Sequence, residues 1–157
     1  MKNFNKIILS IGSNVGNRQQ NIENSLKELS RISYIKKVSS IYDSEALLFE
    51  EQENFFNLVV EVEYKKNPQN LLTDIKRIEK LIGRKETFRY GPRVIDIDII
   101  FFNKTEVQDK ELIIPHYDWQ NRRFIIEPLA ELFTEFKLLD YKINDQKLVK
   151  VGTINYK

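Results

Sequence analysis

The spacing of apolar residues changes several times along this chain, and the order of these changes limits the fold more than any other feature. Residues 6–11 form a short apolar run that ends at turn-forming glycine and asparagine residues, and apolar residues then recur at helical spacing over 22–32. Residues 38–44 have a weaker strand pattern. Residues 55–64 alternate between two chemically distinct faces, which is typical of a strand.

A second helix is predicted after this strand, because its expected boundaries carry suitable residues. Asn67 can cap the first turn, Pro68 suits the first helical position, and Gly83 suits the C-terminal cap. A polar stretch follows, and then the apolar run 94–102, which only two aspartates interrupt. Its length and its β-branched residues favour a strand.

The resulting order is strand, helix, strand, strand, helix, strand, which is the ferredoxin-like βαββαβ arrangement. We therefore predict an α+β fold in which helices pack on an antiparallel sheet. A short helix near residues 127–132 and a hairpin over 137–152 would form a C-terminal extension. A length of 157 residues predicts a single domain over 1–157.

Composition excludes several classes of function. The chain contains no cysteine, which removes disulfides, thiolate metal sites and a cysteine nucleophile. The formal net charge of +2 is too small for a broad surface that binds nucleic acid. No apolar run approaches the roughly 20 residues that span a bilayer, and the first residues lack the apolar stretch of a signal peptide. We expect a cytoplasmic protein that binds neither nucleic acid nor membrane.

Asp96 and Asp98 are two residues apart in an otherwise apolar strand, so both carboxylates project from the same face. Neighbouring carboxylates among isoleucines are costly unless cations or hydrogen-bond donors compensate them. Mg²⁺ prefers oxygen ligands and is often held by one or two carboxylates together with substrate phosphates. The pair therefore indicates a magnesium site, although two aspartates on the solvent face of a sheet would give the same pattern.

Positive charge is concentrated just before these aspartates. A solvated helix face accounts for Arg77 and Lys80, but it does not account for the rigid turn Gly91-Pro92-Arg93 immediately before the acidic strand. The guanidinium of arginine matches phosphate oxygens, so polyphosphate with magnesium explains both groups. Between residues 76 and 93 the cations are Lys76, Arg77, Lys80, Arg84, Lys85, Arg89 and Arg93, against Glu79 and Glu86.

Two further clusters carry side chains suited to ligands. His116, the single histidine, lies in Pro115-His116-Tyr117-Asp118, which Asn121-Arg122-Arg123-Phe124 follows. Phe55 and Asn57 share one strand face, where they could stack on a flat heteroaromatic ring and hydrogen-bond its edge. The glycine-rich turn near residue 12 matches neither a P-loop nor a Rossmann signature.

Together these motifs resemble one family over nearly the whole chain, the 6-hydroxymethyl-7,8-dihydropterin pyrophosphokinases. Residues 89–99, Arg-Tyr-Gly-Pro-Arg-Val-Ile-Asp-Ile-Asp-Ile, are similar to the family signature R-W-G-P-R-x-x-D-x-D-I. The further matches, in family order, are Gly12-Ser13-Asn14, Gln52-x-x-Phe55-x-Asn57, Glu79 with Gly83-Arg84, and Pro115-His116-Tyr117-Asp118 with Asn121-Arg122 and Phe124.

The resemblance implies a magnesium-dependent transfer of pyrophosphate from ATP to 6-hydroxymethyl-7,8-dihydropterin in folate synthesis, with AMP as the second product. It implies that Asp96 and Asp98 hold two Mg²⁺ ions and that the catalytic residues are Arg84, Arg93, Asp96 and Asp98. The residues implied for ATP are Lys76, Glu79, Arg84, Arg93, Ile99, His116, Tyr117 and Arg122. Those implied for the pterin are Ser44, Leu47, Phe55, Asn57, Asp96 and Phe124.

The chain departs from the family pattern at several positions around two loops. Tyr90 replaces the usual tryptophan, Lys76 stands where a glutamine is common, and Glu86 takes the place of a second arginine. Ala46 and Leu48 stand where the family has proline and glycine, and Ser44 replaces threonine. Because both aspartates and Arg93 are kept, these changes bear on how the loops close over ATP.

Two other readings of the residues remain open. A different nucleotidyl or glycosyl transferase could use Asp-x-Asp for magnesium, but it would not explain Phe55, Asn57 and Phe124 together. A ferredoxin-like module could bind a ligand or RNA without catalysis, but no aromatic-rich basic strand of the RNP1 type is visible.

Overall fold

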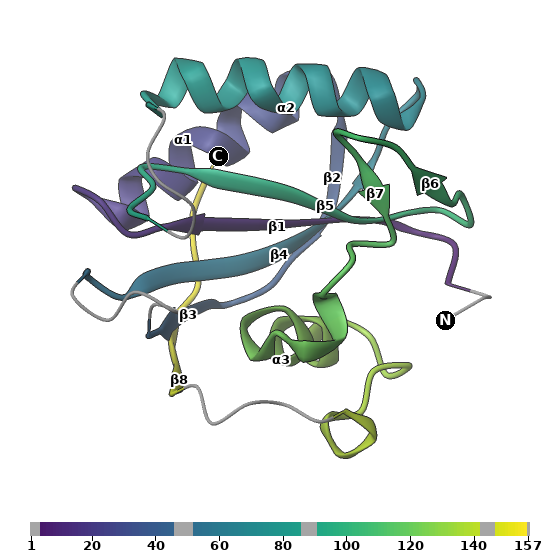
Figure 1. Ribbon diagram of the computed structural model, residues 1–157. Coiled ribbons are helices and arrows are strands. Elements are labelled where there is room, and N and C mark those ends of the chain that lie inside the picture. The colour runs from purple at the N-terminus through teal and green to yellow at the C-terminus, as the bar shows by residue number, and fades with distance from the viewer. Residues whose placement is uncertain (1–3, 46–51, 86–90, 142–146, 157) are drawn as a thin grey trace.

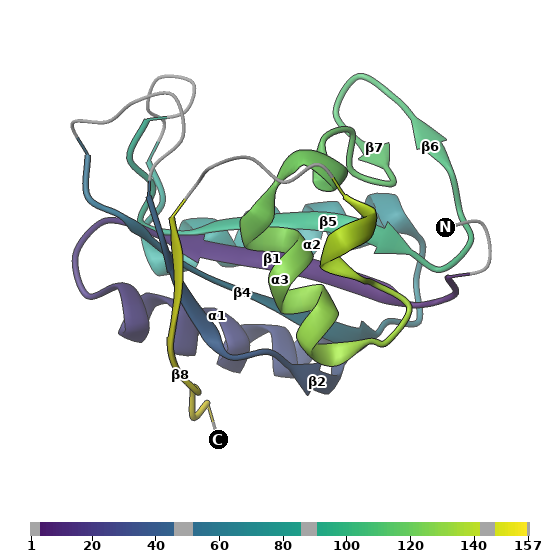
Figure 2. The same cartoon turned by 90° about the horizontal axis from the view of Figure 1, so that it is seen from below.

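The computed structural model describes residues 4–45, 52–85, 91–141 and 147–156. Figure 1 shows three layers, with α1 and α2 above a central sheet and α3 below it; Figure 2 gives the view from the α3 side. The elements are β1 (Ile7–Ser13), α1 (Arg18–Ile32), β2 (Tyr34–Val38), β3 (Ile41–Ser44), β4 (Phe55–Glu63), α2 (Pro68–Ile82), β5 (Asp96–Phe102), β6 (Val107–Gln108), β7 (Ile113–Ile114), the 3-10 helix η1 (Trp119–Asn121), α3 (Arg123–Leu132), the 3-10 helix η2 (Leu138–Asp140) and β8 (Leu148–Gly152).

The main sheet has the order β5-β1-β4-β3-β8, and β2 pairs with β4 beside β3. Neighbouring strands are antiparallel throughout. Because β2 and β3 together take the place of one strand, the order agrees with the ferredoxin-like arrangement. The predicted α+β fold with helices on an antiparallel sheet is confirmed.

Side-chain alternation on the central strand β1 builds two separate cores. Leu9 and Ile11 pack in the core beneath α1 and α2, whereas Ile8 packs in the core that includes Ile126 of α3. A strand that is covered on both faces must be apolar on both, which explains why β1 reads as a continuous apolar run. On the α3 side, Ser10 and Gly12 continue the row that Ile8 begins, and this row leads into the site described below.

The predicted boundaries of α2 are confirmed in detail. The Asn67 side chain accepts a hydrogen bond from the backbone N–H of Asn70 at 2.8 Å, and Pro68 is the first helical residue. Gly83 ends the helix at φ 113°, in the left-handed region that favours glycine. This ending directs the chain toward the basic segment before β5.

The remaining segments differ from two predictions. The strand expected over 38–44 is present as β3 but begins only at Ile41, after a break at Ser39 and Ser40, and the strand β2 that ends at Val38 was not expected. In this break the Ser39 hydroxyl accepts from the N–H of Val59 at 3.0 Å. The hairpin expected over 137–152 is not seen in the described part of that range: Leu138–Asp140 form η2, and β8 pairs with β3. The backbone groups on the open edge of β3 need partners, and a distant segment supplies them. The helix near residues 127–132 is confirmed and begins earlier, at Arg123.

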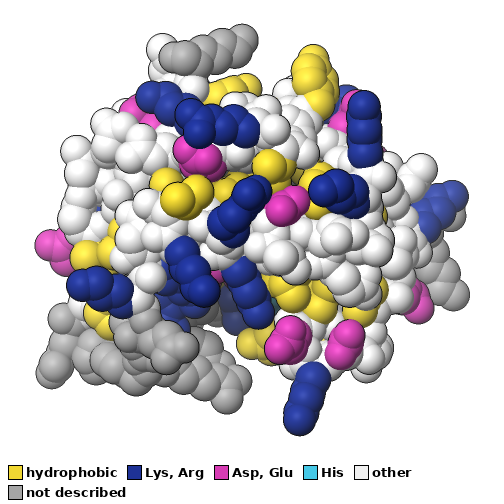
Figure 3. Space-filling model, turned by 90° about the horizontal axis from the view of Figure 1, so that it is seen from above, with side chains coloured by type: hydrophobic (Ala, Val, Ile, Leu, Met, Phe, Trp, Pro, Cys, Tyr) yellow, Lys and Arg dark blue, Asp and Glu magenta, His cyan; other side chains and the backbone are white. Residues whose placement is uncertain are grey.

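The outer face of the helical layer is mixed in charge. Figure 3 shows lysine and arginine side chains spread over this face among acidic and apolar ones. Arg77 pairs with Asp74 and Arg31 pairs with Glu28. These pairs agree with the interpretation of Arg77 as part of a solvated helix face. Within the described ranges, no helix is long and apolar enough to cross a membrane.

Candidate active site

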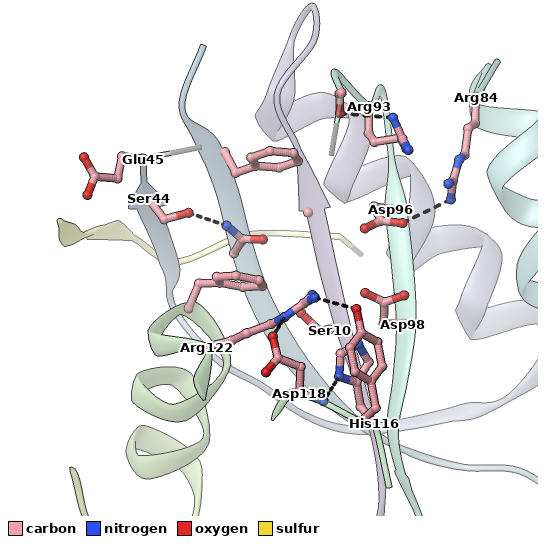
Figure 4. Close-up of a pocket in the computed structure, with 16 residues that line it drawn as sticks. Ser10, Ser44, Glu45, Arg84, Arg93, Asp96, Asp98, His116, Asp118 and Arg122 are labelled. Atoms are coloured by element: carbon pink, nitrogen blue, oxygen red, sulfur yellow. Dashed lines mark hydrogen bonds and ion pairs between the residues drawn. The ribbon is translucent and has the colours of Figure 1, made fainter. Parts of the chain in front are cut away.

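A cavity of about 360 Å³ opens on the α3 side of the sheet, where β1 ends and β4 and β5 begin. The strand register brings these ends together, because Gly12 lies opposite Asn57 on one side and Asp96 on the other. Figure 4 shows side chains from several elements around this space. The predicted site residues that line it are Ser44, Phe55, Asn57, Arg84, Arg93, Asp96, Asp98, His116, Tyr117, Arg122 and Phe124.

Asp96 and Asp98 both line the cavity, as the strand period predicts, while Ile97 between them is buried in the helix-side core. Burial raises the pKa of Asp98 far above its ordinary value, and the negative charge of Asp96 raises that pKa further. The charge of Arg122 opposes this shift. The repulsion between the two carboxylates is therefore only partly compensated by the nearby arginine. A bound cation would reduce this repulsion.

Arg84 is held between two carboxylates. Its guanidinium donates to Glu79 in the last turn of α2 and to Asp96 at 3.1 Å. Glu79 is buried and also accepts from the backbone N–H of Ile97 at 2.9 Å. Burial raises the pKa of Glu79, and the bond from Ile97 and the charge of Arg84 limit that rise. Glu79 therefore lies behind Arg84 and orients it, without lining the cavity itself.

Arg93 is positioned by the turn that follows β1. The side chain of the buried Asn14 accepts from the Arg93 N–H at 2.7 Å, and the Asn14 N–H donates to the Arg93 carbonyl at 3.0 Å. The Asn14 amide also donates to Gln52 at 2.7 Å. The two hydrogen bonds between Asn14 and Arg93 tie the turn after β1 to the segment before β5, so the Gly-Ser-Asn turn helps to position Arg93.

The segment after β7 forms a second wall. The His116 N–H donates to the Ile100 carbonyl at 2.9 Å, which fastens the segment to β5. The Asp118 N–H donates to His116 Nδ1 at 3.1 Å, so the neutral imidazole carries its proton on Nε2. The Asp118 carboxylate accepts from Arg122 Nε at 3.2 Å, and Arg122 also donates to the Tyr117 hydroxyl at 3.3 Å.

His116 is neutral in the free protein at pH 7. Burial, together with the nearby positive charge of Arg122, lowers its pKa to about 4 against the opposing effect of Asp118. The contact of His116 with ATP therefore stays a prediction, in which a neutral imidazole would add no positive charge toward the phosphates. It can instead donate a hydrogen bond from Nε2.

The remaining wall is suited to a flat ring. Phe55 at the start of β4 and Phe124 in the first turn of α3 both line the cavity. Asn57 is buried and donates to the Ser44 hydroxyl at 2.6 Å, which fixes the orientation of its amide. A Cβ atom on Gly12 would lie 2.5 Å from Asn57 Oδ1, so this position accepts no side chain unless Asn57 moves.

Three predicted residues lie away from the cavity, and one lies outside the described residues. Lys76 is exposed on α2 and lines a separate hollow beside Glu111, while Ile99 is buried in the helix-side core. Glu79 lies behind Arg84, as described above. Leu47 lies outside the described residues, as do the departures at Ala46, Leu48, Glu86 and Tyr90.

The cavity also contains residues that the sequence did not indicate as site residues. Asp118 lines it and holds Arg122; its signal was its place after His116 and Tyr117. Ser10 lines it because it lies opposite Asp98 on β1, and Glu45 lines it at the end of β3. No sequence motif around Ser10 or Glu45 would have indicated a site residue.

The donor set fits magnesium that shares its ligands with a substrate. Among residues 4–45, 52–85, 91–141 and 147–156, no group of three or more His, Asp or Glu side chains could hold a metal alone. Asp96 and Asp98 supply carboxylate oxygens on one face, and Arg84, Arg93 and Arg122 supply cations for phosphates. Mg²⁺ is commonly bound by one or two carboxylates with phosphate oxygens, so the residues present suit it.

Comparisons with known proteins agree on one family. A sequence model of the family described as 7,8-dihydro-6-hydroxymethylpterin-pyrophosphokinase matches residues 8–134. A protein of Aquifex aeolicus named 2-amino-4-hydroxy-6-hydroxymethyldihydropteridine pyrophosphokinase is 41% identical over 126 residues, which is 80% of this chain and 79% of the relative. A Bacillus subtilis protein of the same name is 36% identical over 126 residues, with 79% and 75% covered.

The fold has solved counterparts as well. The crystal structure of wild-type Plasmodium falciparum HPPK-DHPS aligns with a TM-score of 0.65 and 17% identity, over 85% of this chain and 42% of that chain. At this identity the likeness concerns the fold alone.

Proposed function

We propose, because this chain belongs to the 7,8-dihydro-6-hydroxymethylpterin-pyrophosphokinase family, that its two substrates meet in the cavity beside β5 and α3. The protein transfers pyrophosphate from ATP to 6-hydroxymethyl-7,8-dihydropterin in folate biosynthesis, giving the pterin diphosphate and AMP. One observation supports this proposal: the aspartate pair of β5, three arginines and two phenylalanines line a single cavity.

The pterin would lie between Phe55 and Phe124. Flat heteroaromatic rings gain from stacking on aromatic side chains, and both phenylalanines line the cavity. The Asn57 amide is held by Ser44 and keeps its Oδ1 and one N–H for the ring edge. Ring recognition therefore depends on Asn57 and Ser44 as a pair.

The phosphates of ATP would lie toward Arg84, Arg93 and Arg122. Arg84 and Arg122 are each oriented by an acidic partner, Glu79 and Asp118, so their guanidinium groups are ordered before a substrate arrives. Ordered cations stabilise developing charge without having to reorganise during the reaction. His116 would add a hydrogen bond from Nε2, and Tyr117, exposed beside it, would contact the nucleotide. Contacts of Lys76, Glu79 and Ile99 with the nucleotide stay predictions.

We propose that Asp96 and Asp98 would hold two Mg²⁺ ions. The two carboxylates would hold the ions at the edge of the cavity, and the bound metal would supply positive charge that neutralises the phosphates of ATP. Asp96 would also lie near the hydroxymethyl group of the pterin. The partners of Arg84 change on loading, because Arg84 shares its guanidinium with Asp96 in the free protein.

In the reaction, the hydroxymethyl oxygen of the pterin attacks the β-phosphorus of ATP and loses its proton. The bond from that phosphorus to the oxygen of the α-phosphate breaks in line, and AMP leaves. The side chains of the cavity contribute by holding both substrates in this alignment and by stabilising charge on the phosphates.

The testing experiment measures AMP formed from ATP with and without the pterin, in Mg²⁺ and in excess EDTA. AMP that requires both pterin and Mg²⁺ would support the proposal. AMP without pterin would indicate hydrolysis, and pterin binding by calorimetry without AMP would indicate a binding protein. AMP formation unaffected by EDTA would contradict the magnesium assignment. A cytoplasmic location stays a prediction of the sequence.

A further inference from the structure

Helix α3 carries Phe124 but has little intrinsic stability. It is ten residues long, its N-cap residue Arg122 makes no capping hydrogen bond from its side chain, and it contains Pro128. A proline has no N–H to donate to the carbonyl four residues earlier, which here is that of Phe124. Isolated helices of this length are marginal in water, so contacts with the rest of the protein must fix the position of α3.

A polar contact near the other end of α3 supplies such a fixed point. The Glu131 carboxylate accepts from the Tyr42 hydroxyl at 2.7 Å, from the Ser40 N–H at 2.9 Å and from the Ser40 hydroxyl at 3.1 Å. Lys150 of β8 lies 3.8 Å from the same carboxylate. Tyr42 and Ser40 are buried, and the Glu131 side chain is 25% exposed. These bonds join residues that are about 90 positions apart, so they fasten α3 to the sheet.

Helix α3 and strand β3 also carry side chains on either side of the space proposed for the pterin ring. Phe124 and Glu131 are seven residues apart, so they lie on one face of α3 about 10 Å from each other. Tyr42 and Ser44 are two residues apart and point to the same face of β3. The contact between Glu131 and Tyr42 therefore fixes the distance between α3 and β3 at one place. Phe124 on the same face of α3 and Ser44 on the same face of β3 then lie at a related distance across the cavity.

We propose that Glu131 is a positioning residue for the pterin, which sets the separation between Phe124 and the Ser44–Asn57 pair through its bonds to Tyr42 and Ser40. The inference rests on the proposed placement of the pterin in this cavity. Glu131 does not line the cavity and touches neither substrate. Its effect should fall on the pterin, because the side chains of Arg84 and Arg122 are held by Glu79 and Asp118, and Arg93 is positioned by Asn14.

The test compares Glu131→Gln and Tyr42→Phe with the wild type. Each variant removes part of the contact while keeping the size of the side chain. We expect the KM for the pterin to rise about tenfold, as for the loss of about one hydrogen bond to a charged group. The KM for ATP and the kcat measured at saturation of both substrates should stay within about twofold of the wild-type values. The effect of the double variant should be smaller than the sum of the two single effects, because both changes weaken the same contact.

Glu28→Gln is the matched control, since Glu28 also pairs with a cation but lies on α1, on the opposite face of the sheet. It should leave both KM values unchanged. Thermal melting of each variant separates positioning from stability: equal rises in both KM values together with a lower Tm would overturn the proposal. An unchanged pterin KM in Glu131→Gln and Tyr42→Phe would also overturn it. If the wild type itself forms no AMP with pterin, the proposed function has failed, which is a different result from an active wild type with insensitive variants.

Discussion

Replacement of Gly12 by alanine should weaken pterin binding without changing any charge in the site. The added Cβ atom would lie 2.5 Å from Asn57 Oδ1 and 3.4 Å from Phe55 Cδ1, and the first distance is shorter than such contacts allow. Gly12 lies on the central strand between two hydrogen-bonded neighbours, so the backbone has little room to retreat. The side chain of Asn57 must therefore rotate.

The magnitude follows from what Asn57 loses. Asn57 is 4% exposed and its amide donates to Ser44 at 2.6 Å, so rotation would break this buried bond and misalign the groups that would contact the pterin ring. A buried polar group that loses its partner costs about 1–3 kcal/mol. This range corresponds to a loss of roughly fivefold to 150-fold in pterin affinity. Binding measured by calorimetry, with ATP binding measured in parallel, would give the number.

A double-mutant cycle isolates the cause. In an Asn57→Ala background the added methyl group has no amide to displace, so Gly12→Ala should then have little further effect on pterin binding. The reasoning is refuted if Gly12→Ala keeps pterin affinity within about twofold, or if its effect adds in full to that of Asn57→Ala.

Further predictions concern the other walls of the cavity. Asp98→Ala should abolish AMP formation while the circular dichroism spectrum stays that of the wild type, and a near-normal rate would contradict the metal assignment. Phe124→Ala should raise the dissociation constant of the pterin more than that of ATP; equal losses in calorimetry would argue against stacking. Glu79→Gln should release Arg84 and lower kcat about tenfold, as expected for one charge-assisted bond, with pterin affinity kept as the internal check. His116 has a folded-state pKa of about 4 against its ordinary 6.5, so the unfolded chain binds more protons between these values and stability falls as pH falls through this window. Urea unfolding at pH 7 and pH 4.5 should accordingly show a smaller loss in His116→Gln than in the wild type, and an equal loss would contradict the assignment.

The sequence by itself determined the features that follow from local periodicity. The two-residue spacing of Asp96 and Asp98 placed both carboxylates on one face, because side chains alternate along a strand. Asn67 and Gly83 marked the ends of α2, because capping depends on residues adjacent in sequence. The strand and helix order likewise followed from patterns within single segments, and the motifs around Arg93 and His116 indicated the family.

Tertiary structure alone decided the features that depend on partners far apart in the chain. Residue spacing does not reveal that Glu79 lies behind Arg84, that Lys76 lies away from the cavity, or that β8 pairs with β3. The neutrality of His116 and the contacts of Glu131 also arise there, because burial and long-range hydrogen bonds exist only once the sheet and its two helical layers have packed together.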